Sequence, residues 1–159
     1  MDLRIGHGFD FHRLVPDREL WLGGVLIPYG MGLSGHSDAD VLIHAVCDAL
    51  LGAMTEGDIG RHFPDTDERY RNIDSRLLLQ KVSELMAEKG WRIMNLDTTL
   101  ILEAPRIAPY IESMRKSMAS VLDIDPGRVS VKATTTEGLG PEGRGEGISA
   151  HAVVLLDKR

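Results

Sequence analysis

Residues 41–54 constrain the fold most strongly, because their apolar side chains recur at the spacing of an α-helix. The apolar positions are Val41, Leu42, Ala45, Val46, Ala49, Leu50 and Ala53. Three glycines between residues 30 and 35 predict a turn before this helix. Ser37 or Asp38 can then accept hydrogen bonds from its first N–H groups. The chain is therefore expected to turn here and enter an apolar helix that ends near residue 54.

Asp40, His44 and Asp48 lie four residues apart, so they form a polar stripe on this helix. A solvated helix face accounts for such a stripe on its own. A second segment near the N-terminus favours another interpretation, because Asp10 and His12 project from the same side of an extended chain. With His44 they make a set of three nitrogen and oxygen ligands, which zinc accepts with a fourth position open.

Composition limits the kind of partner. The chain has 159 residues, a formal net charge of −6, 43% hydrophobic and 26% charged residues, typical of one globular domain over residues 1–159. The negative charge argues against nucleic acid and anionic membrane as partners. The single cysteine, Cys47, excludes an internal disulfide and suits a reducing compartment. No apolar run reaches membrane-spanning length and residues 1–4 lack a signal-peptide core, so we expect a cytoplasmic protein.

Strand and helix patterns alternate along the chain. Strands are expected at residues 2–9, 19–22 and 25–27 (a hairpin arm), 93–102, 129–132 and 150–156. Further helices are expected from Asp74 or Ser75 to Gly90, and from Ile107 to a stop near residues 125–127. Residues 56–71 are rich in turn-formers and predict an exposed loop or a mobile flap. The order indicates an α+β (α/β-like) fold, with a mixed β-sheet and helices packed on one face.

The segment over residues 132–147 is suited to phosphate. Thr134, Thr135 and Thr136 offer hydroxyls, and five glycines between 138 and 147 let backbone N–H groups approach an anion. Arg144 has a planar guanidinium group that suits phosphate, and Glu137 could neutralise a divalent ion carried on phosphates. A flexible hairpin loop explains the pattern equally well. The segment matches neither the P-loop nor the dinucleotide fingerprint.

Taken together, these motifs resemble the 2-C-methyl-D-erythritol 2,4-cyclodiphosphate synthase family of the non-mevalonate isoprenoid pathway. The resemblance covers nearly the whole chain, and several motifs in the family's order are more specific than any one alone. The matching segments are residues 6–12, 36–44, 58–60, 63–67, 104–105, 132–137 and 143–147.

The resemblance implies a homotrimer with active sites between subunits. It also implies a metal-dependent phosphorus–oxygen lyase, which converts 4-diphosphocytidyl-2-C-methyl-D-erythritol 2-phosphate to the 2,4-cyclodiphosphate and CMP. By position, Asp10, His12 and His44 would bind Zn²⁺, and Glu137 a second ion, Mg²⁺ or Mn²⁺.

The resemblance also assigns further roles by position. The catalytic residues would be His36 and Thr135. The substrate contacts would be Ser37, Asp58, Ile59, Gly60, Phe63, Pro64, Asp65, Thr66, Asp67 and Arg144. The contacts to the cytidylyl group would be Ala104, Pro105, Arg106, Thr134 and Thr136.

Three residues depart from the family pattern. Pro141 stands where some members place an aromatic residue, Arg106 replaces a lysine, and Glu103 adds a negative charge near the expected nucleotide pocket. Two other functions compete with the synthase. A trimeric zinc- and nucleotide-binding module would need no catalytic pair, and a zinc hydrolase would be expected to carry an H-E-x-x-H helix, which this sequence lacks.

Overall fold

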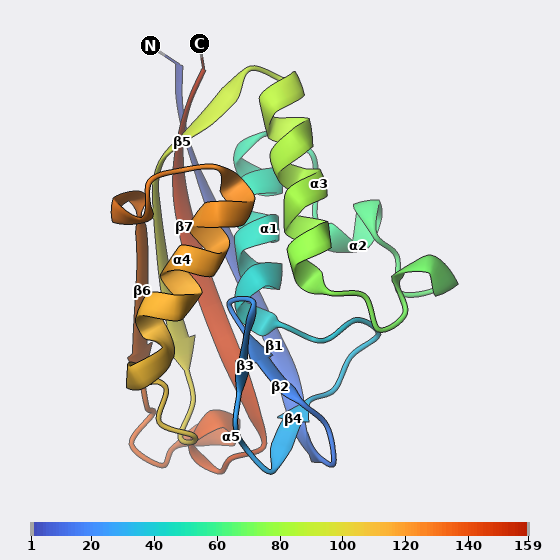
Figure 1. The fold of residues 1–159 in the computed structure, drawn as a ribbon, viewed down its shortest axis with the longest axis vertical. Coiled ribbons are helices and arrows are strands. Elements are labelled where there is room, and N and C mark those ends of the chain that lie inside the picture. The colour runs from blue at the N-terminus through green and yellow to red at the C-terminus, as the bar shows by residue number, and fades with distance from the viewer. Residues whose placement is uncertain (1, 159) are drawn as a thin grey trace.

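A five-stranded sheet in the order β4-β1-β7-β5-β6 forms the centre of the computed structural model, which describes residues 2–158 (Figure 1). Its strands are β1 (Asp2–Pro16), β4 (Met31–Leu33), β5 (Trp91–Ile101), β6 (Val129–Thr134) and β7 (Gly147–Lys158). β5 and β6 are parallel, whereas the other neighbours are antiparallel, so the sheet is mixed. β2 (Leu20–Leu22) and β3 (Val25–Ile27) form the predicted hairpin.

Three long helices lie on one side of the sheet, as Figure 1 shows. They are α1 (Val41–Ala53), α3 (Ser75–Glu88) and α4 (Ile111–Leu122). The short helices are α2 (Ile59–His62), α5 (Gly140–Gly143), and the 3₁₀ turns η1 (Glu68–Tyr70), η2 (Ala108–Tyr110) and η3 (Pro126–Arg128). Helix α1 packs on β1 and β7 and is covered by α3, which confirms the predicted single-domain α+β architecture. Among the described residues, no helix is long and apolar enough to cross a membrane.

Two glycines of β1 allow α1 to lie against the sheet. A Cβ atom on Gly6 would lie 1.9 Å from the carbonyl oxygen of Ala49, and one on Gly8 would lie 1.8 Å from that of Ala45. No side chain fits in this space, so the helix backbone rests directly on the strand. Asp10 and His12 follow on the same face of β1, since side chains two residues apart point the same way.

Asp40 joins α1 to the β2–β3 hairpin. Its carboxylate accepts hydrogen bonds from the backbone N–H groups of Ile43, Gly23 and Gly24, at 3.1, 2.9 and 2.7 Å. Asp40 is therefore the N-cap of α1, and the prediction of Ser37 or Asp38 in that position is wrong. The side chain is fully buried, and burial raises its pKa to about 6. The solvated-face interpretation of the polar stripe thus fails for Asp40.

Other predicted boundaries also need correction. β1 was expected to end at residue 9 but continues to Pro16, because it pairs with β7 as far as Arg13 and then with β4. Asp10 and His12 therefore lie within β1, beyond the strand end that the sequence predicts. β4 was missed because the sequence around residues 30–35 predicts only a turn. The helix expected from residue 107 begins as the turn η2, and the expected loops at residues 56–71 and 138–147 contain short helices.

The close contact between β1 and α1 predicts that Gly8→Ala destabilises the protein by roughly 3 kcal/mol, because the added methyl group overlaps the Ala45 carbonyl. Gly52→Ala is the matched control, since a Cβ at this exposed position of α1 meets nothing within 4 Å. The control should gain up to about 1 kcal/mol through helix propensity. Urea unfolding of both variants measures the difference. Equal stability of the two variants would contradict the proposed packing constraint.

Candidate metal centre

Asp10 and His12 of β1 converge with His44 of α1. Asp10 Oδ2 lies 2.9 Å from His12 Nε2 and 3.1 Å from His44 Nδ1, and the two ring nitrogens are 3.1 Å apart. His44 is buried, and the other two side chains are partly buried. This arrangement confirms the prediction that the three residues form one potential metal site.

The donor atoms suit a divalent cation. His12 Nδ1 lies 2.8 Å from the carbonyl oxygen of Ser34, which can only accept, so Nδ1 carries the proton of the neutral ring and the Nε2 lone pair is available to an ion. A zinc ion about 2.0–2.1 Å from each of three tetrahedral ligands would separate those ligands by roughly 3.3 Å. The observed separations are close to this spacing, so the residues present fit such an ion.

The charges of the cluster are strongly coupled. Burial alone would raise the pKa of Asp10, but hydrogen bonds and positive charge from His12 and His44 hold it well below its usual range. Burial alone would lower the pKa of His12, but the hydrogen bond and negative charge of Asp10 raise it above the ordinary value. Asp10 is therefore held as a carboxylate, and an ion bound here would replace the proton that His12 shares with it.

A cavity of about 510 Å³ opens beside the three ligands. The residues that the sequence predicted for the site and that line this cavity are Asp10, His12, His36, Ser37, His44, Ile59, Gly60, Phe63, Pro64, Asp65 and Thr66. Sequence reasoning missed Tyr70 and Leu78 as lining residues. Tyr70 packs edge-on against Phe63 with ring centroids 5.4 Å apart, and Leu78 could have been found only as an inner-face residue of its helix. The segment from Ile59 to Thr66 thus forms one wall of the cavity.

Two acidic residues that flank this segment shape it without lining the cavity. Asp58 caps α2 by accepting from the N–H of Arg61 at 3.0 Å, and Asp67 caps η1. The backbone oxygen of Asp67 also accepts a hydrogen bond from His36 Nε2 at 2.9 Å. Their direct contact with a substrate therefore stays a prediction.

Asp48, the third residue of the polar stripe, anchors the same wall to α1. Its carboxylate accepts from the backbone N–H of Ile59 at 2.7 Å. Burial raises the pKa of Asp48. The helical spacing predicted that Asp48 lies on the same helix face as His44, but no sequence pattern predicted its hydrogen bond with Ile59.

A second cavity of about 350 Å³ lies at the ends of β5 and β6. Of the predicted cytidylyl contacts it contains Pro105, Arg106 and Thr134, while Ala104 and Thr136 do not line it. Thr135 also lines it, as does Glu103, so the additional negative charge of Glu103 lies at this cavity.

One chain does not bring the two predicted halves of the site together. Thr135 and Glu137 follow β6, which is separated from β1 by β7 and β5 (Figure 1). Three strand spacings amount to roughly 14 Å. Glu137 is exposed, and its backbone N–H bonds to Thr135 Oγ1 at 3.2 Å. Arg144 already has a carboxylate partner, since its Nε donates to Glu146 at 2.7 Å.

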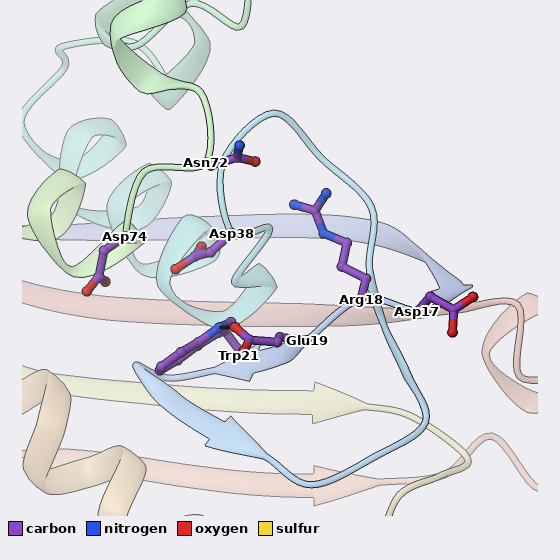
Figure 2. A pocket seen from close by; sticks show the side chains of 7 residues that line it. All are labelled: Asp17, Arg18, Glu19, Trp21, Asp38, Asn72 and Asp74. Carbon is purple, nitrogen blue, oxygen red and sulfur yellow. Dashed lines mark hydrogen bonds between the residues drawn. The ribbon is translucent and has the colours of Figure 1, made fainter.

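A third cavity, of about 470 Å³, lies behind the turn at residues 35–38 and contains no predicted site residue. Figure 2 shows the side chains that line it, which are Asp17, Arg18, Glu19, Trp21, Asp38, Asn72 and Asp74. Arg18 donates to the backbone oxygens of Gly35 and Ser37, at 3.1 and 2.5 Å, and so holds the turn beside the metal centre. We call this space the rear cavity.

The fold and this cluster define a single-domain α+β protein with a candidate divalent-metal centre. Comparison with known proteins is more specific, because the sequence model of the YgbB family matches residues 3–157. The chain belongs to this family.

Relatives and solved structures agree with this assignment. A 2-C-methyl-D-erythritol 2,4-cyclodiphosphate synthase of Syntrophotalea carbinolica is 60% identical over 156 residues, which cover 98% of this chain and 95% of the relative. The synthase of Nitrosospira multiformis is 62% identical over 96% of this chain and 86% of its own length. A structure described as the CDP complex of IspF from Plasmodium falciparum is similar with a TM-score of 0.88 and 33% identity, covering 99% of this chain and 97% of that one.

The geometry predicts that His44→Ala removes most bound zinc, because Asp10 and His12 alone hold an ion poorly. His62→Ala is the matched control, since His62 lies outside the cluster and bonds to the backbone oxygen of Glu56. Elemental analysis after gel filtration measures the zinc, and circular dichroism checks folding. Full zinc content in folded His44→Ala would refute the ligand set.

Proposed function

We propose that this protein is a 2-C-methyl-D-erythritol 2,4-cyclodiphosphate synthase of the non-mevalonate isoprenoid pathway. It converts 4-diphosphocytidyl-2-C-methyl-D-erythritol 2-phosphate to the 2,4-cyclodiphosphate and CMP. The observation that carries the proposal is the convergence of Asp10, His12 and His44 beside a cavity lined by residues between Ile59 and Thr66, in a chain of the YgbB family. The reaction makes it a phosphorus–oxygen lyase.

The proposed reaction needs no nucleophile from the protein. An oxygen of the substrate's own 2-phosphate forms a bond to the β-phosphorus, the bond from that phosphorus to the bridging oxygen breaks, and CMP leaves with that oxygen. Phosphoryl transfer of this kind depends on positioning and on neutralising charge. Cys47 is unsuited to attack, because it is buried in α1 and burial raises the pKa of its thiol.

The residues of the cavity would position the methylerythritol phosphate. Zn²⁺ held by Asp10, His12 and His44 would polarise a substrate phosphate oxygen. The backbone around Gly60 and the hydroxyl of Ser37 would bind polar groups of the substrate, while Phe63 would exclude water. His36 would donate to the transferring phosphate after exchanging its hydrogen bond to the backbone oxygen of Asp67.

The residues after β6 would serve the nucleotide. The cavity at Pro105, Arg106 and Thr134 would hold the cytidylyl group, with Thr135 at the phosphate end. Glu137 is exposed and would hold Mg²⁺ or Mn²⁺ that arrives with the substrate diphosphate. The predicted role of Arg144 requires release of its ion pair with Glu146.

The separation of the metal cluster from the residues after β6 supports a homotrimer with sites between subunits. The sheet face turned away from α1 exposes Ile5 to 74%, Phe9 to 52% and Val153 to 43%, an apolar surface that another copy could cover. Within one chain, Thr135 and Glu137 lie away from the cluster of Asp10, His12 and His44. A neighbouring chain could bring its own Thr135 and Glu137 to that cluster. Closed cyclic symmetry would build three equivalent sites.

The proposed function predicts that the protein converts the cytidine-diphospho substrate to a cyclic diphosphate and CMP. Phosphorus NMR measures this conversion. Glu137→Gln should lower kcat by about 10²–10³, the usual loss for one electrostatic contact to the transition state, with zinc content unchanged. Glu142→Gln is the control, because this carboxylate lies in the same segment but accepts a hydrogen bond from Ser149 of β7. Substrate binding without CMP release by the wild type would instead identify a binding module.

Shared sites predict complementation between two inactive variants. An equal mixture of His44→Ala and Glu137→Gln chains, assembled at random, should regain about a quarter of wild-type sites, because each mixed trimer has one interface with both intact halves. Native mass spectrometry verifies the mixed trimers. Activity no higher than that of the separate variants would contradict sites shared between chains.

A further inference from the structure

The second ring nitrogen of His44 points away from the metal cluster toward two buried hydroxyl groups. His44 Nε2 lies 2.9 Å from Ser75 Oγ and 3.1 Å from Ser37 Oγ. Ser75 is fully buried at the start of α3, and Ser37 is 7% exposed. Neither water nor a charged group is needed to satisfy this nitrogen.

Ser75 is in turn fixed by Asp38. The hydroxyl of Ser75 donates to Asp38 Oδ1, and its backbone N–H donates to Asp38 Oδ2 at 2.9 Å. The backbone N–H of Asp40 donates to Asp38 Oδ1 at 3.0 Å. Asp38 therefore receives three hydrogen bonds, as a carboxylate does, and it lines the rear cavity (Figure 2).

The direction of these hydrogen bonds determines where His44 carries its proton. A carboxylate accepts only, and Ser75 has one hydroxyl proton, which is committed to Asp38. Ser75 Oγ can then only accept from His44, so the proton of the neutral ring lies on Nε2. In the metal-free cluster Nδ1 lies 3.1 Å from Asp10 Oδ2, and an ion would take the lone pair of Nδ1 in place of this contact.

We propose that Asp38 and Ser75 are positioning residues that hold His44 in its metal-binding tautomer and so set the affinity of the centre for zinc. The inference rests on the proposed metal site and names two residues that do not touch the ion. His12 reaches the same state through the Ser34 carbonyl. Of the two histidines, only His44 has its tautomer set by side chains, so substitution of those side chains can change it.

Two variants test the proposal on the full-length protein. Ser75→Ala removes the nearer of the two hydroxyl groups at His44 Nε2, and Asp38→Asn allows the Ser75 hydroxyl to reverse its direction. Both should weaken zinc binding by about 10–100-fold, the usual effect of removing such an outer partner. Asp74→Asn is the matched control, because Asp74 lines the same cavity and caps the same helix, but bonds to Arg76. Its zinc affinity should change less than about twofold, since Asp74 is not one of these partners.

Competition with a chromogenic chelator measures the zinc affinity. Nitrogen-15 NMR of the metal-free wild type gives the tautomer directly, with the proton of His44 expected on Nε2 and a mixture of tautomers in Ser75→Ala. A wild-type ring protonated on Nδ1, or unchanged zinc affinity in both folded variants, would overturn the proposal.

The metal centre and the tautomer of His44 are tested by separate measurements. A wild type that binds no zinc removes the proposed metal centre, whereas the tautomer of His44 in the metal-free protein still tests the role of Ser75 and Asp38. If both variants fail to fold, the wild-type spectrum alone decides between the two tautomers.

Discussion

The contact between the backbone of α1 and that of β1 is the constraint on which the rest of the structure depends. Gly6 and Gly8 leave no side chain between the strand and the carbonyl groups of Ala45 and Ala49. This separation places His44 within 3.1 Å of Asp10 Oδ2. A strand with side chains at these positions would hold the helix farther away, and the histidine would not reach the ligands on β1.

The buried position of α1 makes its polar groups costly unless each has a partner. Asp40 receives three backbone N–H groups, Asp48 anchors Ile59, and His44 lies between the metal cluster and Ser75. Each residue of the stripe therefore connects the helix to a different neighbour. The same hydrogen bonds that satisfy buried groups also orient the candidate metal centre and the wall of its cavity.

The sequence predicts the parts of this structure that are local. The period of residues 41–54 identified α1, and the alternation of Asp10 and His12 placed both on one face of a strand, where the structure has them. The predicted N-cap of α1 was wrong because Asp40 accepts hydrogen bonds from the backbone of Gly23 and Gly24, a long-range contact that no local pattern encodes.

The rear cavity was missed for the same reason, since Trp21, Asp38 and Asn72 come from three separate segments. The extent of β1 was underestimated because its pairing with β7 joins the two ends of the chain. The roles of Thr135 and Glu137 came from family resemblance, and one chain places them away from the metal cluster.

The most direct test of the account is the anomalous X-ray scattering of crystals grown with zinc, measured at the zinc absorption edge. We expect a peak about 2.0–2.2 Å from Asp10 Oδ2, His12 Nε2 and His44 Nδ1, with the remaining position facing the cavity of about 510 Å³. Zinc located elsewhere, or bound to His44 through Nε2, would contradict both the ligand set and the role of α1 in assembling it.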